Sequence, residues 1–319
     1  MSCHAAKRRG QGQRSSRPAK LGSRTPLPWP SRVRPFPLAD VWLASVTMEL
    51  AGNSGVCDRL VLGMTPSLGI RYLGGPTALV EIAGLRLLTD PTFDPAGPHP
   101  VGSRVLVKTS DPVATAEQLG PVDAVLLSHD QHPDNLDELG RNYLTGAPLA
   151  LSTHSARQRL GDPVRALADG AHVQLGPLRI TGVPARHGPR GCEPLTGEVT
   201  GFVLSGEGLP TVYISGDNAS LDIVGLVASR FADIDVALLF AGAARTALLD
   251  GAYLTLTSQQ AAEAAAVLHA RHIVPLHFEG WAHFTQGRDT LHAAFGDAGL
   301  LDRLHLLDPG QRWTLPVPG

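Results

Sequence analysis

The sequence predicts an α+β fold of four layers, an αββα sandwich in which two β-sheets pack face to face and helices cover both outer faces. Three observations support it. Short β-type runs joined by glycine-containing turns begin near Leu68, and strand-like segments then alternate with helix-like ones. The same order recurs after Gly176. Finally, 35 glycines and 26 prolines among 319 residues favour a sheet-rich fold with many turns over a helix bundle.

The chain divides by composition into two parts. Residues 1–63 carry ten Lys and Arg against three Asp and Glu, and residues 1–37 show no hydrophobic period. We therefore predict a disordered basic extension over 1–63 and one folded domain over 64–319. Of the 27 basic and 29 acidic residues in the chain, 17 and 26 then remain in the domain, which makes it acidic.

Composition also limits the partners. An acidic domain repels phosphate backbones, and few aromatic residues are present for base stacking, so nucleic acid is disfavoured. Apolar stretches fall far short of the roughly 20 residues that a membrane span needs. Three scattered cysteines without a CxxC pair imply no disulfide framework and favour the cytoplasm. We expect a small-molecule substrate, with oligomer formation left open.

The first half of the domain begins with strands. Residues 69–75, 77–84 and 85–90 predict three short strands, with a hairpin turn at Ala83 and Gly84. Proline and glycine make 90–100 a loop, and a spacer follows. A buried strand then starts at Pro121, and a helix is predicted over 135–144 with Asn135 as its N-cap.

The remaining elements follow from the same patterns. Strands are predicted at 148–153, 172–176 with 178–185, 199–206 with 211–217, 234–242, 272–277, and finally 304–310 with 312–317. Helices are predicted at 154–161, 220–231, 258–270 and 287–299. The alternation also suits a Rossmann domain, but no GxGxxG follows the first strand, so we reject that fold.

The segment Val122–Asp137, VDAVLLSHDQHPDNLD, is the chemical centre of the sequence. An apolar strand leads directly into nine residues that hold two His and three Asp. His187, Asp217 and His277 follow later, mostly where other apolar runs end. Imidazole nitrogen and carboxylate oxygen are the ligands of cations such as Zn²⁺, and strand ends hold them rigidly. This pattern predicts a divalent metal centre.

The ordered set of motifs resembles the metallo-β-lactamase-fold hydrolases, in the branch similar to ascorbate-6-phosphate lactonases, from about Leu68 to the C-terminus. The signature of that family, His-x-His-x-Asp-His after an apolar strand, is matched by His129, His132 and Asp134. The later His, Asp and His of the family are matched by His187, Asp217 and His277. The resemblance implies one metal on His129, His132 and His187, and a second on Asp134, His277 and a bridging Asp217.

The motif departs from the family at two points. Its spacing here is His-x-x-His-x-Asp-Asn, so counting back from the Asp places Asp130 rather than His129 at the first ligand position. Both registers remain open. Asn135 stands where the family has a His, and as a neutral ligand it weakens the second site or favours a harder ion. We therefore expect one or two ions, Zn²⁺ or Mn²⁺.

These residues predict metal-dependent hydrolysis of a lactone, ester, amide or phosphodiester by an activated water. Asp134 is expected to orient the water and accept a proton. Asp90, Asp130, Asn135 and His283 are expected to support the site or contact substrate, whereas other histidines, His272 and His305 among them, are taken as ordinary solvent-facing residues. One alternative is a degenerate, non-catalytic metal-binding member of the fold. A nuclease, suggested by the basic extension, is less favoured.

Overall fold

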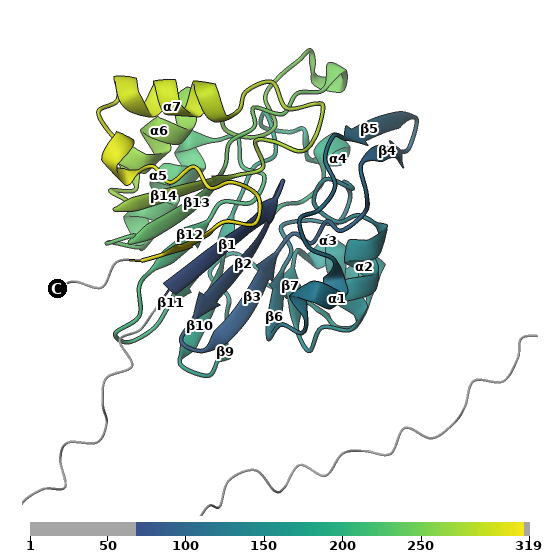
Figure 1. The fold of residues 1–319 in the computed structure, drawn as a ribbon, viewed down its shortest axis with the longest axis horizontal. Coiled ribbons are helices and arrows are strands. Elements are labelled where there is room, and N and C mark those ends of the chain that lie inside the picture. The colour runs from purple at the N-terminus through teal and green to yellow at the C-terminus, as the bar shows by residue number, and fades with distance from the viewer. Residues whose placement is uncertain (1–67, 316–319) are drawn as a thin grey trace, which may run out of the picture. The chain divides into compact units, whose positions relative to one another are not determined.

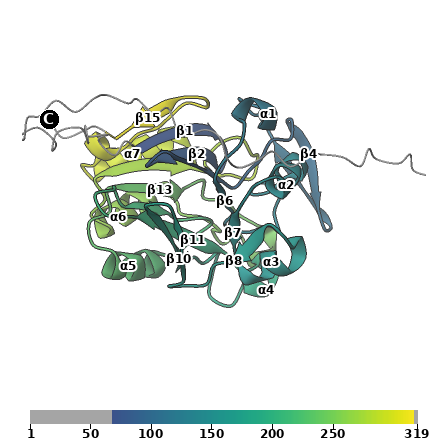
Figure 2. The same ribbon diagram turned by 90° about the horizontal axis from the view of Figure 1, so that it is seen from below.

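The computed structural model describes residues 68–315, and the predicted extension over 1–63 lies outside this part. The described residues form two β-sheets that pack face to face, with helices on both outer faces (Figures 1 and 2). The predicted four-layer sandwich is therefore confirmed.

The first sheet has seven strands. Their spatial order is β15 (Arg312–Thr314), β1 (Leu68–Gly74), β2 (Thr77–Ile82), β3 (Leu85–Thr89), β6 (Ala124–Leu126), β7 (Ala150–Ser152) and β8 (Val164–Ala166). Strands β1 to β3 pair antiparallel, whereas β3, β6, β7 and β8 run parallel. Ala83 and Gly84 form the predicted turn with φ of 53° and 79°, the left-handed conformations that a tight hairpin requires.

The second sheet has six strands and repeats this plan. Their spatial order is β14 (His272–Leu276), β13 (Val236–Phe240), β12 (Val212–Ile214), β11 (Thr200–Ser205), β10 (Leu178–Pro184) and β9 (His172–Leu175). Strands β9 to β12 pair antiparallel, and β12 to β14 run parallel. Strand β13 is buried along its whole length, as its continuous apolar sequence predicts.

Helices cover the outer faces. On the six-stranded sheet lie α5 (Leu221–Arg230), α6 (Ser258–Val267) and α7 (Arg288–Asp297); beside the seven-stranded sheet lie α1 (Ala116–Leu119), α2 (Glu138–Thr145) and α3 (His154–Leu160). Three short helices occupy connections: α4 (Glu193–Thr196), η1 (Ala247–Leu249) and η2 (Leu301–Arg303).

Three hydrophobic clusters fill the spaces between the four layers. The cluster between the sheets includes the fully buried Tyr72, Phe202 and Phe240. A second joins the six-stranded sheet to α5, α6 and α7, and a third joins the seven-stranded sheet to α1 and α2. Each large side chain buried in this way contributes roughly 1.5–3 kcal/mol. The rigid sheets thereby give their strand ends fixed positions.

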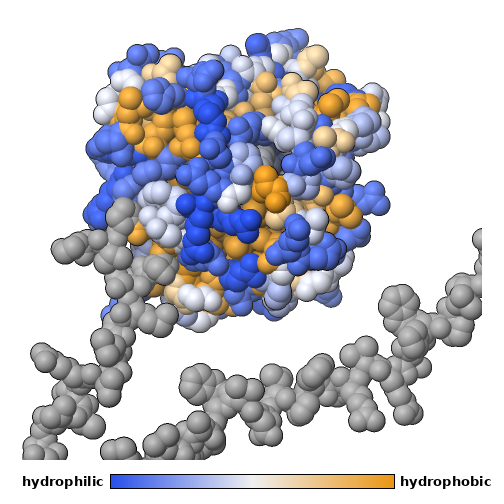
Figure 3. Space-filling view, in the orientation of Figure 1, coloured by the Kyte–Doolittle hydropathy of each residue, from blue (hydrophilic) through white to orange (hydrophobic). Residues whose placement is uncertain are grey.

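One hairpin was missed by the sequence analysis. Strands β4 (Gly97–Val101) and β5 (Arg104–Lys108) pair antiparallel within the segment predicted to be a loop and spacer. Pro98 and Pro100 cannot donate ladder hydrogen bonds, but they alternate along β4, so they occupy one edge while the intervening residues pair. Exposed Val105 and Val107 lie on β5, and hydrophobic residues are visible in this area of the surface (Figure 3).

The hairpin is anchored at its base. The Lys108 ammonium is buried and donates to the carbonyls of Thr92 and Asp94 at 3.2 and 2.8 Å, and to Asp137 Oδ2 at 3.3 Å. The Thr109 N–H donates to the Gly280 carbonyl at 2.8 Å. The base of the hairpin therefore connects the start of α2 to the segment that follows β14.

Two predictions, one helix N-cap and one strand, were wrong. Helix α2 begins after Asp137, whose carboxylate accepts from the Gly140 N–H, so Asp137 rather than Asn135 is its N-cap. The predicted strand over 304–310 is absent from the described residues except for a single bridge between Leu304 and Ile273. Arg288 donates to two carbonyls of this segment instead, and β15 pairs with β1. Strand β8 was not predicted.

Candidate metal centre

The candidate site lies where strands of both sheets end. Asp90 follows β3, His129 follows β6, His187 follows β10, Asp217 follows β12 and His277 follows β14. Each follows the carboxyl end of its strand, and the parallel strands place these ends at one edge of the sandwich. Side chains far apart in the sequence are thus brought together.

Three imidazoles form the tightest group. The rings of His129, His132 and His187 lie 5.0–5.2 Å apart between centroids. One ligand nitrogen from each lies within 4.8 Å of the other two. His129 Nε2 and His132 Nδ1 face each other at 2.9 Å. This spacing suits three nitrogens converging on one small cation.

Neighbouring groups fix the orientation of two of these rings. His187 Nδ1 donates to the Leu254 carbonyl at 2.9 Å, which leaves Nε2 with a free lone pair. The Ser128 hydroxyl donates to Asp90 Oδ2 at 2.7 Å and lies 3.0 Å from His129 Nδ1. Because the hydroxyl hydrogen is used by Asp90, Ser128 accepts from Nδ1, and Nε2 of His129 is left as the acceptor.

A second group contains carboxylates. His277 Nε2 lies 3.3 Å from Asp134 Oδ2, and His277 Nδ1 lies 3.3 Å from Asp217 Oδ1. Asp217 Oδ2 also lies 3.4 Å from His187 Nδ1, so this aspartate touches both groups. His283 Nε2 approaches Asp134 Oδ2 at 3.0 Å.

Burial keeps His129 and His132 of the first group neutral. It lowers the pKa of His132 to about 4, with further lowering from the neighbouring His187. Burial and the adjacent imidazoles of His132 and His187 hold the pKa of His129 well below its usual value. At neutral pH both rings therefore carry the lone pairs that metal binding requires.

Charge controls the second group. Burial alone would lower the pKa of His277, but the carboxylates of Asp217 and Asp134 outweigh it and raise that pKa. Burial would likewise raise the pKa of Asp134, yet His283 and His277 hold it well below its usual range. Asp90 differs, because burial dominates there and raises its pKa to about 7.

Several buried polar atoms of the site have no hydrogen-bond partner within residues 68–315. They are His187 Nε2, both ring nitrogens of His277, Asp134 Oδ1 and Asp217 Oδ2. An unsatisfied buried group costs about 1–3 kcal/mol, and less where it lies 3.3–3.4 Å from an opposite charge, as the His277 nitrogens and Asp217 Oδ2 do. Divalent cations would satisfy these nitrogens and oxygens together, so the residues present fit a metal centre.

The structure separates the two candidates for the first ligand position. His129 lies in the imidazole group, whereas the Asp130 carboxylate accepts from Arg159 Nε at 2.9 Å and pairs with its Nη2. Asn135 is fully buried and donates from Nδ2 to Asp217 at 3.1 Å and to Asp90 at 3.2 Å. The amide thus supports two carboxylates. The metal-binding roles assigned to the individual residues stay predictions.

Backbone conformation contributes to the placement of two of these residues. His277 has a φ of 54°, which a side chain other than glycine adopts only at some cost, and such strain is typical of functional sites. Gly216, directly before Asp217, has a φ of 56°, and a Cβ there would lie 2.6 Å from the Thr200 carbonyl oxygen. Only glycine suits that turn.

Sequence reasoning missed Ser128 and the Leu254 carbonyl, which orient His129 and His187. Ser128 directly precedes His129 and could have been considered as a tautomer-fixing partner. The Leu254 carbonyl carried no such signal, because any residue supplies a backbone oxygen and the loop that brings it to His187 is remote in sequence.

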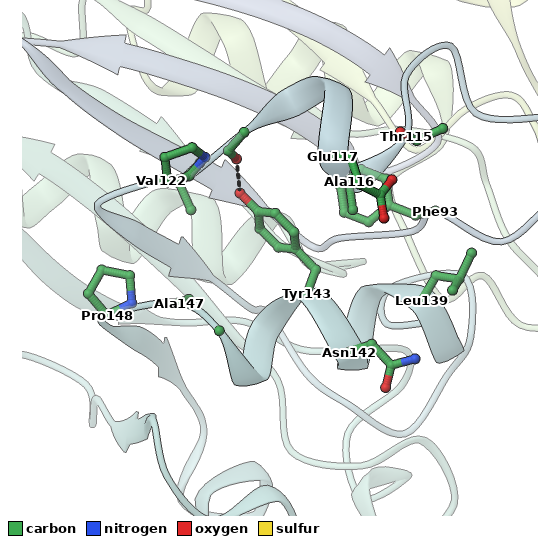
Figure 4. A pocket seen from close by; sticks show the side chains of 13 residues that line it. Phe93, Thr115, Ala116, Glu117, Val122, Leu139, Asn142, Tyr143, Ala147 and Pro148 are labelled. Carbon is green, nitrogen blue, oxygen red and sulfur yellow. Dashed lines mark hydrogen bonds between the residues drawn. The ribbon is translucent and has the colours of Figure 1, made fainter. Parts of the chain in front are cut away.

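A separate cavity of about 510 Å³ lies between α1 and α2 (Figure 4). Tyr143 points across it and donates to the Gly120 carbonyl at 2.7 Å. The lining is mostly apolar and includes Phe93, Val122 and Leu139, and it shares no residue with the imidazole and carboxylate groups. This cavity does not belong to the candidate metal centre.

The two packed sheets and the His and Asp residues at their strand ends define a hydrolase of the metallo-β-lactamase fold. The chain belongs to the β-lactamase superfamily, whose domain model matches residues 85–278. It is 26% identical over 214 residues to a UPF0173 metal-dependent hydrolase from Pyrococcus furiosus, an alignment that covers 65% of this chain and 88% of the relative.

Solved structures agree with this fold. An isothiocyanate hydrolase from Delia radicum gut bacteria superimposes with a TM-score of 0.66 at 22% identity, over 77% of this chain and 98% of that one. For a protein from Veillonella parvula described as a possible metal-dependent hydrolase, the TM-score is 0.69 at 18% identity, over 77% and 99% of the two chains. Among residues 68–315, no helix is long and apolar enough to cross a membrane.

Proposed function

We propose that this hydrolase works with divalent cations, zinc or manganese, held by two groups of side chains: His129, His132 and His187 in one, and Asp134, Asp217 and His277 in the other. The observation that carries this proposal is the set of five buried nitrogen and oxygen atoms without a partner in the described part of the chain. Hydrogen-bonded support of the His187 and His129 rings, on the side away from those lone pairs, adds to it.

A bound divalent cation would supply Lewis acidity. It would lower the pKa of water, so that water can lose a proton and act as a nucleophile at neutral pH, and it would polarise a scissile carbonyl or phosphoryl group. The protein supplies orientation and a proton acceptor. Asp134 stays ionised because His283 and His277 stabilise its charge, and its Oδ1 has no partner within residues 68–315. Asp134 is therefore placed to orient the attacking water and accept its proton.

The proposed substrate is a small molecule with a lactone, ester, amide or phosphodiester bond. The order of the four motifs supports the branch similar to ascorbate-6-phosphate lactonases. The neighbour named an isothiocyanate hydrolase adds another small electrophile to the candidates. Cys192 is a buried free thiol, which suits the proposed cytoplasmic setting.

Metal analysis and hydrolysis assays test the proposal together. The purified protein should contain at least one equivalent of zinc or manganese and should hydrolyse activated esters, lactones or phosphodiesters in a chelator-sensitive manner. His132→Ala and Asp134→Ala should abolish hydrolysis while circular dichroism shows a retained fold. His154→Ala, an exposed histidine on α3, is the matched control and should keep full activity. Equal activity in all three variants, or less than one equivalent of metal, would favour a degenerate member of the fold.

A further inference from the structure

His283 stands beside the second group of candidate ligands. Its Nε2 lies 3.0 Å from Asp134 Oδ2, the same oxygen that His277 Nε2 approaches at 3.3 Å. Two imidazoles from different segments therefore face one carboxylate oxygen. A similar combination of imidazole nitrogen and carboxylate oxygen occurs where His187 approaches Asp217.

Packing and the backbone hold the ring of His283 in place. The Ala282 N–H donates to the Val107 carbonyl at 2.9 Å, which ties this segment to β5. The Phe284 ring contacts both imidazoles, with centroids 4.5 Å from His283 and 4.6 Å from His277. Packing and backbone bonds thus fix the position of His283.

Its polar atoms are poorly explained by a structural role. The side chain is 17% exposed, and Nδ1 is buried without a hydrogen-bond partner in the range 68–315. An unpaired buried nitrogen costs free energy, so packing alone does not account for this ring. With its proton on Nδ1, a neutral His283 ring presents the lone pair of Nε2 at the Asp134 side of the site.

Asn135 provides the second observation. It occupies the position where the motif resemblance calls for a third imidazole, but its amide is engaged by Asp217 and Asp90. The second group therefore lacks one nitrogen from the motif segment. His283 brings a nitrogen to Asp134 from the segment after β14.

We propose that His283 is a metal ligand in this chain and completes, with Asp134 and His277, a second cation site that Asn135 leaves short of one imidazole. This inference rests on the proposed metal dependence and deepens it. The imidazole comes from the loop after β14, so the two-cation arrangement is kept although the motif has changed.

The test is metal stoichiometry, measured by inductively coupled plasma mass spectrometry after loading with zinc and exhaustive dialysis. The wild-type chain should hold two equivalents. His283→Ala and the similarly sized His283→Gln should each hold one, and His283→Cys should recover the second because a thiolate binds zinc well. In cobalt-loaded protein, the visible absorption should fall in the Ala and Gln variants and return in the Cys variant. His292→Ala, an exposed histidine on α7, is the control and should hold two.

The outcomes separate the two levels of the proposal. Two equivalents in both His283→Ala and His283→Gln would overturn the role of His283 and leave metal dependence intact. A single equivalent in the wild-type chain would do the same, because no second site would exist. Less than one equivalent in the wild-type chain would overturn the metal dependence itself, and the second site with it.

Discussion

Two groups of histidines in this molecule have similar spacing and different surroundings. In the candidate metal centre, the rings of His129, His132 and His187 lie 5.0–5.2 Å apart. At the start of β14, His272 and His305 lie 5.2 Å apart, with Nδ1 and Nε2 facing at 3.0 Å. Distance between imidazoles alone therefore does not distinguish a metal centre.

The surroundings distinguish them. His272 and His305 are only half-buried, they bond to each other, and both pack on Trp313, so they are not simply the solvent-facing residues predicted from the sequence. The nearby Asp235 carboxylate is engaged by Arg271 and the Thr211 N–H. In the candidate metal centre, by contrast, buried carboxylate oxygens and ring nitrogens lack hydrogen-bond partners within the described range. Converging polar atoms without hydrogen-bond partners indicate a metal site better than the closeness of histidines does.

The largest expected effect comes from Asp217, which touches both groups of the centre. Asp217→Asn removes a charge next to His187 and His277, and kcat/KM for a metal-dependent ester or phosphodiester assay should fall by more than about 100-fold. Asp235→Asn, beside the other histidine pair, should leave kcat/KM within about two-fold of wild type. Similar losses in the two variants would remove the distinction drawn above.

Metal removal should destabilise one region and spare the other. A cation present at about 100 times its dissociation constant stabilises the native state by roughly 2.7 kcal/mol, so chelation should lower Tm measured by calorimetry. Hydrogen exchange should rise around the loops that carry His129 and His187 and stay unchanged around His272. In Asp217→Asn, the chelator should shift Tm much less. An equal chelator response in this variant would contradict the assignment.

A smaller effect is expected from the hydroxyl that orients His129. Ser128→Ala removes the acceptor of His129 Nδ1, and metal affinity should fall by about 10–100-fold in competition with a chromogenic chelator. Ser229→Ala, exposed at the end of α5, should not change it. Unchanged affinity in Ser128→Ala would show that His129 needs no support on this side.

The smallest effect concerns pH and the outer histidine pair. Burial, and for His305 also the neighbouring His272, lowers the pKa of both rings, while Asp235 partly offsets this at His272. The unfolded chain then binds protons more readily than the folded one. The contribution of the neutral His272 and His305 rings to the free energy of unfolding is complete above pH about 6.5. It declines as the pH falls towards their lowered pKa values in the folded state. His305→Gln should weaken the pH dependence of the free energy of unfolding, measured by urea titration, without changing hydrolysis. An unchanged pH dependence would argue against this role of the His272–His305 pair.

The sequence could predict the four-layer fold because most strands are marked by local patterns. The turn at Ala83 and Gly84 and the fully buried β13 needed no information from elsewhere in the chain. The hairpin β4–β5 was missed because Pro98 and Pro100 argue locally against a strand, and only the alternation of their positions against β5 makes pairing possible. Pairing of this kind is decided by the partner strand.

The residue types of the candidate site could be predicted from the sequence, but their spatial arrangement could be predicted only in part. His129 and Asp130 are adjacent ligand types, and Arg159, a remote partner on α3, decides which one faces away. Asn135 and Asp137 are both good capping residues, and the choice between them depends on Asp217 and Asp90 from other strands. Contacts with residues remote in the sequence settle such choices, and a local motif contains no information about them.

Anchorage at the base of the β4–β5 hairpin has an evolutionary consequence. Lys108 and Thr109 attach the base of the hairpin to the start of α2 and to Gly280, whereas Gly102 and Ser103 at its tip are exposed. Mutations or insertions at the tip can therefore accumulate without displacing the strand ends that carry the candidate metal centre. Diversification among descendants of this protein would be expected to begin at the tip, with Lys108 and Asp137 retained.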